Sequence, residues 1–205
     1  FPNTETQVFG NPVRELPKME SLSRPKEFLE GKKAVLVVGG SQGARGINTK
    51  MEESLPEIAK RSDVSVVWQA GAKNVEAIRE RVSIPENVTL TAFLDNIYSY
   101  MGYADLIVSR AGASTLAEIL AFGKPSILFP FPFATANHQE FNARVVEKAG
   151  AALVELDSEP NGLWHKVERL LADGKALSEM AFRAKSIGMP DAADKIAKVI
   201  VDSEC

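Results

Sequence analysis

A glycine-rich segment at residues 37–46, Val-Val-Gly-Gly-Ser-Gln-Gly-Ala-Arg-Gly, lies where an aliphatic run gives way to a helical pattern. Gly39, Gly40 and Gly43 permit a tight turn and a close approach of the backbone to a ligand. The free N–H groups at the start of the following helix, together with its dipole, favour an anion such as a diphosphate. The spacing is neither G-x-G-x-x-G nor that of a P-loop, so a turn needed only for packing stays an alternative.

A second segment of the same kind covers residues 109–118, Ser-Arg-Ala-Gly-Ala-Ser-Thr-Leu-Ala-Glu. It also joins a predicted strand to a predicted helix, whose start Ser114 or Thr115 can cap. Glu118 then lies within about one turn of that start. An ionised carboxylate there can accept two hydrogen bonds from a ribose diol. The alternative is a capping box, in which Glu118 bonds back to the backbone.

A third candidate is the segment at residues 131–143, in which a proline-containing loop runs into a helix capped by Asn137. His138, Gln139 and Asn142 follow, and polar side chains in this position can bind sugar hydroxyls. A single histidine at a helix start is more typical of a surface or capping residue than of a catalyst. We therefore interpret this helix start as a candidate binding site rather than a catalytic one.

Arg14 ends a short segment, Gly-Asn-Pro-Val-Arg at residues 10–14, in which Pro12 stiffens a turn. A guanidinium binds phosphate through two parallel hydrogen bonds and stays charged at every working pH. From this segment alone, the simpler interpretation of a surface arginine prevails.

A weaker candidate is the segment at residues 92–97, Ala-Phe-Leu-Asp-Asn-Ile, between a predicted strand and a helix capped by Asp95. Backbone groups around Leu94 could contact the edge of a flat base. The segment also fits an ordinary hydrophobic start of a helix.

Predicted strands and helices alternate along the chain. They must position the candidate segments described above. Short, continuously apolar runs predict strands covered on both faces at residues 34–38, 64–69, 88–90, 106–109, 126–129 and 152–154. Helical patterns occur at residues 43–60, 74–81, 96–101, 114–122, 137–149, 162–172, 175–186 and 191–202. The alternation predicts an α/β fold with a Rossmann-like parallel sheet, helices on both faces and right-handed crossovers. Ligands of such sheets bind at the carboxyl ends of the strands, where the candidate segments begin.

Length and composition limit the classes of protein that fit. The 205 residues suit one large domain, and a net charge of −3 gives no sign of a nucleic-acid partner. The one cysteine, Cys205, cannot form a disulfide framework or a zinc cluster. The most apolar run, residues 127–133, contains Pro130 and Pro132, so no transmembrane helix is predicted. Because the chain begins at Phe1 without an initiator Met or signal peptide, we interpret it as a piece of a longer protein.

The sequence offers no residues for two common kinds of catalysis. It has no Asp-x-Asp pair to hold a divalent metal against a diphosphate, so neither a metal nor a cofactor is predicted. Helix dipoles and Arg14 would have to stabilise the charge instead. It also has no Ser-His-Asp or Cys-His set, and we assign no catalytic residue to this chain.

Taken together, the candidate segments resemble in type and order those of the MurG family, the UDP-N-acetylglucosamine transferases of glycosyltransferase family 28. The segments that carry the resemblance are residues 10–14, 39–44, 109–118 and 137–143. It extends over essentially the whole chain, to the helix start at residues 189–193. The resemblance implies the C-terminal half of a GT-B fold, with residues 31–205 as the donor-binding domain and residues 1–30 as a connecting segment.

The resemblance also implies roles for individual residues. Arg14 and Ser41 would contact the diphosphate. Glu118 would bind the ribose, and the backbone of Leu94 the uracil. Gln139 would bind hydroxyls of N-acetylglucosamine, and the histidine before it stands where family members often carry a second glutamine. The full set of candidate substrate-binding residues is Arg14, Gly40, Ser41, Gln42, Gly43, Leu94, Ala113, Ser114, Thr115, Leu116, Ala117, Glu118, His138 and Gln139.

As substrates, the resemblance implies UDP-N-acetylglucosamine and lipid I, which the family converts to lipid II in peptidoglycan synthesis. An N-terminal acceptor domain would carry the lipid I site, the membrane-facing patch and the general base of an inverting transfer. We therefore expect this chain to bind donor without turnover. The whole enzyme would lie in the cytoplasm, on the inner face of the plasma membrane, or in a plastid if the source is a plant.

Three alternatives stay open. The chain could be the donor-binding subunit of a split UDP-N-acetylglucosamine transferase that works with a separate membrane partner. A UDP-sugar epimerase shares the two-domain architecture but needs acid and base carboxylates in its cleft, and no obvious pair is present. A dinucleotide-binding module would need G-x-G-x-x-G spacing and an acidic residue after the second strand, where Trp-Gln-Ala-Gly stands at residues 68–71.

Overall fold

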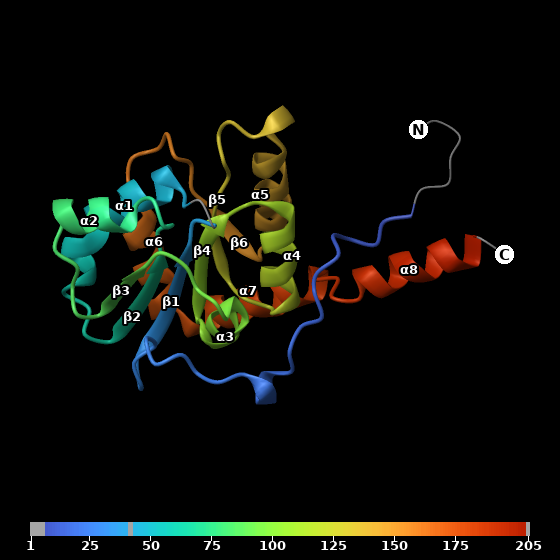
Figure 1. The fold of residues 1–205 in the computed structure, drawn as a ribbon, viewed down its shortest axis with the longest axis horizontal. Coiled ribbons are helices and arrows are strands. Elements are labelled where there is room, and N and C mark those ends of the chain that lie inside the picture. Colours follow the sequence, from blue (N-terminus) through green and yellow to red (C-terminus); the bar gives the residue numbers. More distant parts are fainter. Residues whose placement is uncertain (1–6, 41–42, 204–205) are drawn as a thin grey trace.

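The computed structural model describes residues 7–40 and 43–203. At its centre lies one sheet of six parallel strands in the order β3-β2-β1-β4-β5-β6 (Figure 1). The strands are β1 (Lys33–Val38), β2 (Val64–Gln69), β3 (Val88–Thr91), β4 (Leu106–Arg110), β5 (Ser126–Phe129) and β6 (Ala152–Val154). All lie close to the predicted ranges, because an unbroken apolar run is required wherever a strand is covered on both faces.

Helices connect the strands and close the chain. They are α1 (Arg45–Ile58), α2 (Val75–Arg81), α3 (Ile97–Tyr103), α4 (Ala113–Ala121), α5 (His138–Lys148), α6 (Leu163–Ala172), α7 (Gly174–Ile187) and α8 (Ala192–Ser203). Short 3₁₀ turns lie at Met19–Ser21 and Thr135–Asn137. The predicted doubly covered parallel sheet is confirmed.

The two faces of the sheet bury different sets of side chains. On β1, Val35 and Val37 pack beneath α1, α2 and α6, whereas Leu36 and Val38 pack on the side of α3. Leu128 of β5 lies on that second side, beneath α4 and α5. Alternate side chains of each strand therefore hold opposite helix layers, which fixes the positions of the loops between strands and helices.

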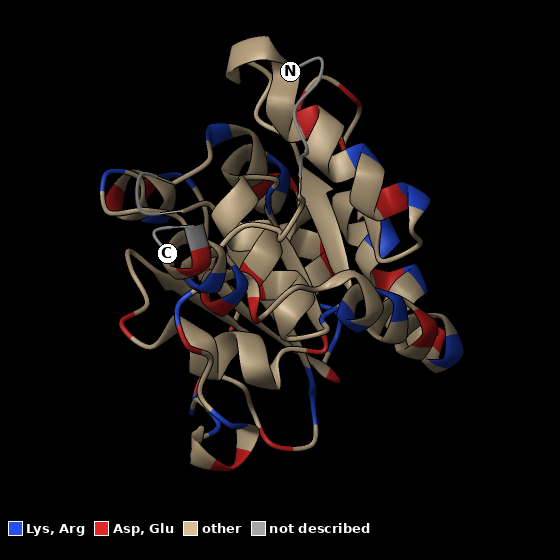
Figure 2. Cartoon of the chain, turned by 90° about the vertical axis from the view of Figure 1, so that its right-hand side faces the viewer, with Lys and Arg blue, Asp and Glu red and all other residues tan. Residues whose placement is uncertain are grey.

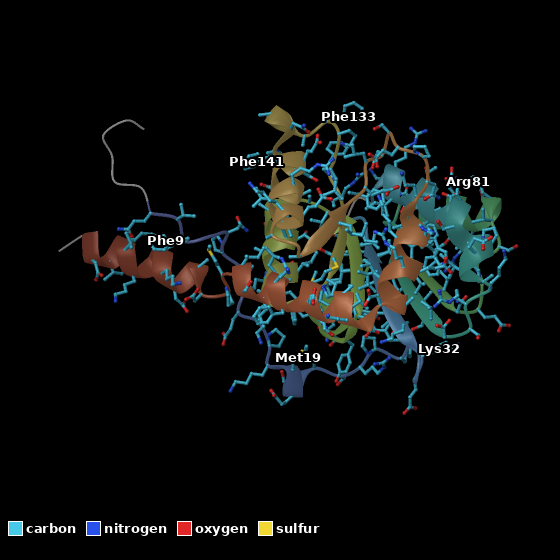
Figure 3. The ribbon with its side chains drawn as sticks, turned by 180° about the vertical axis from the view of Figure 1, so that it is seen from behind. Phe9, Met19, Lys32, Arg81, Phe133 and Phe141 are labelled. Atoms are coloured by element: carbon cyan, nitrogen blue, oxygen red, sulfur yellow. The ribbon has the colours of Figure 1, made fainter. Side chains whose placement is uncertain are left out.

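The two glycine-rich junctions leave neighbouring strands. Strands β1 and β4 pair in register, with Val38 opposite Ser109 at their carboxyl ends. From there α1 turns toward one face of the sheet and α4 toward the other, because the strand order reverses at this point. This is the topological switch point, where open α/β sheets bind ligands. Figure 3 shows Phe133 at this end of the sheet and Lys32 at the other.

The N-terminal residues before β1 form an extended strap with one 3₁₀ turn in the described part. Phe28 and Leu22 anchor the strap by inserting their side chains against the α3 side. At the far end of the chain, α8 extends away from the sheet beside the strap (Figure 1). Viewed from the α8 side, basic and acidic residues are interspersed over the helices (Figure 2). Among the described residues, no helix combines the length and apolarity needed to cross a bilayer.

Candidate functional site

The first junction, between β1 and α1, is a turn in which Gly40 and Gly43 are needed for different reasons. Gly40 and Gly43 have φ of 76° and 75°, in the left-handed region that favours glycine. A Cβ on Gly43 would collide with the Ala70 carbonyl oxygen and the Asn74 amide, so the turn approaches its own backbone there. At Gly40 a Cβ would meet no described atom within 4 Å, so that side of the turn is open. The predicted contacts of Ser41 and Gln42 lie outside the described residues.

The second junction begins α4 one residue earlier than predicted. Gly112 is the N-cap, and no side chain among the described residues caps the helix. The expected cap by Ser114 or Thr115 is therefore wrong, because both already lie in the first helical turn. Ala113 and Ser114 are exposed. An uncapped helix start leaves N–H groups directed at the loop mouth, which is the arrangement that binds anions.

Glu118, one turn into α4, accepts a hydrogen bond from a tyrosine and not from the backbone at the start of its helix. The Tyr98 hydroxyl donates a 3.0 Å hydrogen bond to Glu118 Oε1, so the capping-box alternative is wrong. Burial raises the pKa of the Tyr98 hydroxyl, the bond to Glu118 raises it further, and the charge of Arg14 opposes both. Arg14 is exposed, and because its charge acts on the Tyr98 hydroxyl, it lies near this pair. Glu118 Oε2 has no partner among the described residues and can accept further hydrogen bonds.

The loop between β3 and α3 brings Leu94 close to the same mouth. Its side chain is buried in the α3 cluster at 7% exposure, while its backbone N–H and C=O make no bond within the described chain. The predicted cap by Asp95 is wrong, since Asn96 is the N-cap and its amide donates to the Ser99 hydroxyl at 2.8 Å. A buried side chain with free backbone groups suits contact with the edge of a base.

A strained loop precedes α5. Ala136 and Asn137 have φ of 51° and 54°, a left-handed conformation that costs energy in residues other than glycine. Asn137 occupies the N-cap position as predicted, but its side chain makes no capping bond to the backbone, and its amide donates to Glu140 Oε2 at 2.7 Å. His138 Nδ1 lies 2.7 Å from the Thr135 carbonyl oxygen. Since a carbonyl only accepts, Nδ1 carries the hydrogen, and in a neutral ring Nε2 is then an acceptor.

Gln139 joins this loop to its own helix. Its Oε1 accepts a 3.0 Å hydrogen bond from the Phe131 amide, which leaves the two N–H donors of the side chain available. Asn142, one turn on, donates to the Ala111 carbonyl at 3.4 Å, so it connects α5 to the second junction. Of the predicted polar residues at this helix start, His138 and Gln139 therefore keep groups that a ligand could use.

Sequence reasoning missed an ion pair that links three loops. Arg110, at the end of β4, donates two hydrogen bonds of 2.7 and 2.8 Å to the Asp157 carboxylate, which follows β6. The same guanidinium donates to the carbonyl oxygens of Phe129 and Pro130 at 3.2 and 3.3 Å. A Cβ on Gly46 would meet the Asp157 carboxylate, so this ion pair also contacts the first turn of α1. The available signal was a pair of opposite charges, one at the last residue of a strand and one in the loop after another strand.

A second ion cluster fixes the loop that carries Asp157. Lys50 of α1 and Glu155 are 5% and 1% exposed, and their charged atoms lie 2.8 Å apart. Lys166 bonds the other carboxylate oxygen, and the Gly162 amide donates to Glu155 at 3.2 Å. Burial raises the pKa of the Glu155 carboxyl, but these hydrogen bonds outweigh it and lower that pKa below 4.5. The cluster ties α1 to the β6–α6 loop.

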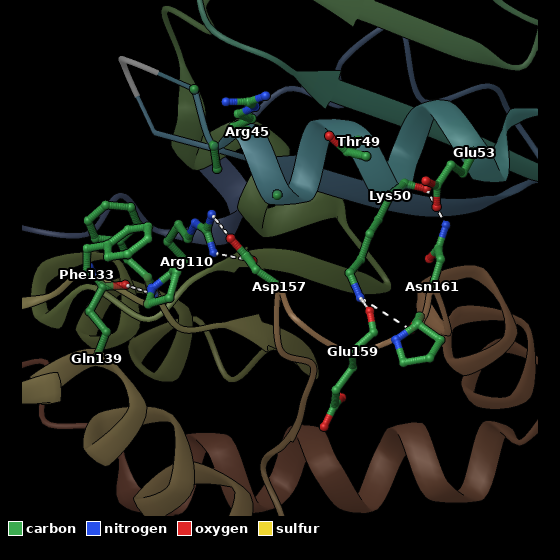
Figure 4. A pocket seen from close by; sticks show the side chains of 16 residues that line it. Arg45, Thr49, Lys50, Glu53, Arg110, Phe133, Gln139, Asp157, Glu159 and Asn161 are labelled. Carbon is green, nitrogen blue, oxygen red and sulfur yellow. Dashed lines mark hydrogen bonds and ion pairs between the residues drawn. The ribbon is translucent and has the colours of Figure 1, made fainter.

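Between α1 and the loops after β5 and β6 lies an open cavity of about 680 Å³ (Figure 4). Gly43 and Ala44 of the first junction, Gln139, Arg110 and Asp157 are among the residues that line it. Within residues 7–40 and 43–203, no three His, Cys, Asp or Glu residues group so as to hold a metal ion.

The six-stranded parallel sheet, with its mouth at the β1–β4 switch point, has the fold of the C-terminal half of a GT-B glycosyltransferase. The chain belongs to glycosyltransferase family 28, whose C-terminal domain matches residues 34–196.

Relatives and solved structures support this assignment. The chain is 45% identical to the UDP-N-acetylglucosamine–N-acetylmuramyl-(pentapeptide) pyrophosphoryl-undecaprenol N-acetylglucosamine transferase of Desulfitobacterium hafniense, over 82% of this chain and 48% of that one. It is 40% identical to the same-named enzyme of Halothermothrix orenii, over 96% and 56%. The crystal structure of Acinetobacter baumannii MurG superposes with a TM-score of 0.75 at 26% identity, over 98% and 58%. The chain thus spans about half the length of these relatives.

Proposed function

We propose that this chain is the donor-binding part of a UDP-N-acetylglucosamine transferase that converts lipid I to lipid II in peptidoglycan synthesis. The observation that carries the proposal is the meeting of the two glycine-rich junctions at the β1–β4 switch point, in a chain 45% identical to a transferase of that name. In this proposal, residues 31–205 form the donor domain and residues 1–30 connect it to the rest of the enzyme.

The nucleotide lies across the mouth of the two junctions. The diphosphate sits between the open side of Gly40 and the uncapped start of α4, where helix dipoles and the Arg14 guanidinium offset its charge. The ribose hydroxyls bond to Glu118 Oε2, which the Tyr98 contact leaves available. The backbone of Leu94 contacts the uracil. The nucleotide site also includes the remaining residues of the two junctions, which are Ser41, Gln42, Gly43, Ala113, Ser114, Thr115, Leu116 and Ala117.

The sugar extends from the diphosphate toward α5. Gln139 binds sugar hydroxyls through its side-chain N–H donors, because its carbonyl oxygen is already bonded to Phe131. His138 Nε2 is a further acceptor for a hydroxyl. The strained loop before α5 holds both residues in place.

The acceptor and the general base belong to the rest of the enzyme. Transfer with inversion needs a base that deprotonates the acceptor hydroxyl as UDP leaves. We assign no such base to this chain, so donor binding without turnover is expected of it alone. The whole enzyme acts in the cytoplasm at the inner face of the membrane, where its lipid acceptor resides.

Titration calorimetry of the chain without added metal tests the proposal. UDP and UDP-N-acetylglucosamine should bind, UDP-glucose more weakly than UDP-N-acetylglucosamine, and NAD not at all. Binding of NAD but not of UDP would overturn the nucleotide assignment. Transfer of sugar to a lipid I analogue by this chain alone would contradict the assignment of the base elsewhere.

A further inference from the structure

Two tyrosines of α3 hold the strap that precedes β1. The Tyr103 hydroxyl donates a 3.1 Å hydrogen bond to the Leu22 carbonyl oxygen. The Tyr100 hydroxyl donates a 3.0 Å hydrogen bond to Glu27 Oε2. The Tyr100 ring also meets the buried Phe28 ring edge to face, with ring centroids 5.7 Å apart. One helix therefore fixes the strap at two points, by hydrogen bonds and by ring packing.

The backbone of α3 also comes close to the strap. A Cβ on Gly102 would lie 2.7 Å from the Leu22 side chain, so any larger residue at this position would push the strap outward. On the strap, the Arg24 guanidinium lies 5.8 Å from the centre of the Tyr103 ring, a cation–π contact. Strap and helix thus fit closely along this stretch (Figure 1).

The strap has a second anchor nearer its start. Gly10 has φ of 85°, and a Cβ on it would lie 2.8 Å from the Met189 sulfur, between α7 and α8. Between this anchor and the contacts with α3, Pro12 and Pro17 restrict φ on either side of Arg14. The segment that carries Arg14 is therefore held at both ends, and its two prolines reduce the conformations that it can adopt.

The position of Arg14 depends on this segment. Its side chain is exposed and makes no hydrogen bond or ion pair with the residues that the structure describes. Its charge acts on the Tyr98 hydroxyl, which is bonded to Glu118, so the strap brings the guanidinium beside the proposed ribose site. An arginine on a free segment would lose more conformational entropy when it binds an anion than one on a segment fixed in advance.

We propose that Tyr100 and Tyr103 are positioning residues for the diphosphate, because they fix the strap that carries Arg14. The inference rests on the proposed function, in which Arg14 binds the diphosphate. In this inference neither tyrosine touches the nucleotide. The same helix follows the loop of Leu94 and carries Tyr98, so α3 sets the relative positions of the groups that contact base, ribose and diphosphate.

The test uses the whole chain with the double substitution Tyr100→Phe/Tyr103→Phe, which removes both hydroxyls and keeps both rings. Titration calorimetry compares the affinities for UDP and for uridine with those of the wild type. UDP affinity should fall about three- to tenfold, the cost of ordering one long side chain on binding, while uridine affinity stays within about twofold. In an Arg14→Ala background the double substitution should cost UDP no further affinity, because residues that act through Arg14 have no effect once it is absent.

A second variant and a control accompany this experiment. Gly102→Ala displaces the strap by adding an atom and leaves both tyrosines in place, so it should reproduce the loss that is specific to UDP. Arg81→Gln is the matched control, because it breaks two hydrogen bonds of 2.9 and 2.7 Å to Glu52, on the opposite face of the sheet from α3. The control should leave both affinities unchanged.

Each outcome decides the inference. If the double variant loses UDP and uridine affinity equally, or loses neither, the inference is overturned. A loss of UDP affinity that persists in the Arg14→Ala background overturns it as well, while the proposed donor site stands. Should the double variant not fold, Gly102→Ala decides by the same criteria. Failure of the wild-type chain to bind UDP would instead count against the proposed function.

Discussion

The Tyr98 hydroxyl donates a 3.0 Å hydrogen bond to Glu118 Oε1 and so orients the carboxylate at the mouth of the sheet. The two residues come from the first turn of α3 and from α4, helices that follow different strands. Their contact places the loop with Leu94 beside the start of α4. The proposed base and ribose positions are therefore held in a fixed relation before a nucleotide binds.

Glu118→Ala should weaken binding of UDP by about 1.5–3 kcal/mol, because the ribose would lose a charged hydrogen-bond acceptor. Titration calorimetry measures the change. Tyr98→Phe is the control, since it removes the hydroxyl on Oε1 but keeps the carboxylate, and a smaller loss is expected. Unchanged affinity in Glu118→Ala would exclude this residue from the ribose.

Arg14→Ala should cost UDP more binding free energy than uridine, because only UDP carries the charge that a guanidinium stabilises. The expected difference is about 1.5–3 kcal/mol, the range for a charged hydrogen bond. Calorimetry gives the four binding free energies needed, those of UDP and of uridine with the wild type and with Arg14→Ala. Equal losses for the two ligands would remove Arg14 from the diphosphate.

Asp157→Asn should reduce affinity for UDP-N-acetylglucosamine while leaving that for UDP nearly unchanged. The substitution breaks the paired hydrogen bonds that hold Arg110, which supports the loop leading to Gln139. Asp63→Asn is a matched control: Asp63 also forms two 2.8 Å bonds to one arginine, Arg61, but lies before β2, at the other end of the sheet. A parallel loss for both ligands would show that the pair does not act on the sugar end.

Glu155→Gln should destabilise the fold by about 3–5 kcal/mol, because it leaves the buried Lys50 ammonium without its counter-charge. Urea unfolding measures the free energy of unfolding. Glu57→Gln, in an exposed ion pair with Lys60, should change little. An equally small effect of Glu155→Gln would contradict a structural role for the buried cluster.

The Glu155 carboxyl also makes the free energy of unfolding depend on pH. Its pKa in the folded state lies below 4.5, so the stability it contributes is present above that value in the wild type. This stability is lost as the pH falls through the lowered folded pKa. Urea midpoints between neutral pH and pH 3 should therefore fall more steeply for the wild type than for Glu155→Gln.

The sequence predicted those features that depend on continuous local patterns. The apolar runs predicted each strand, and their alternation with helices placed both glycine-rich junctions at one edge of the sheet. The predicted cap residues were wrong at Ser114 and Asp95, and Asn137 occupies the N-cap position without a side-chain capping bond, because a cap depends on the backbone angles of a single residue. No local pattern could join Arg110 to Asp157, since a chain distance of 47 residues separates them.

An amide NMR titration of the chain with UDP shows whether both junctions contact one nucleotide. Amides at residues 39–46 and at residues 111–118 should shift together and saturate with one dissociation constant, because both junctions contact a single nucleotide. Shifts confined to one junction, or two different dissociation constants, would contradict the proposed donor site.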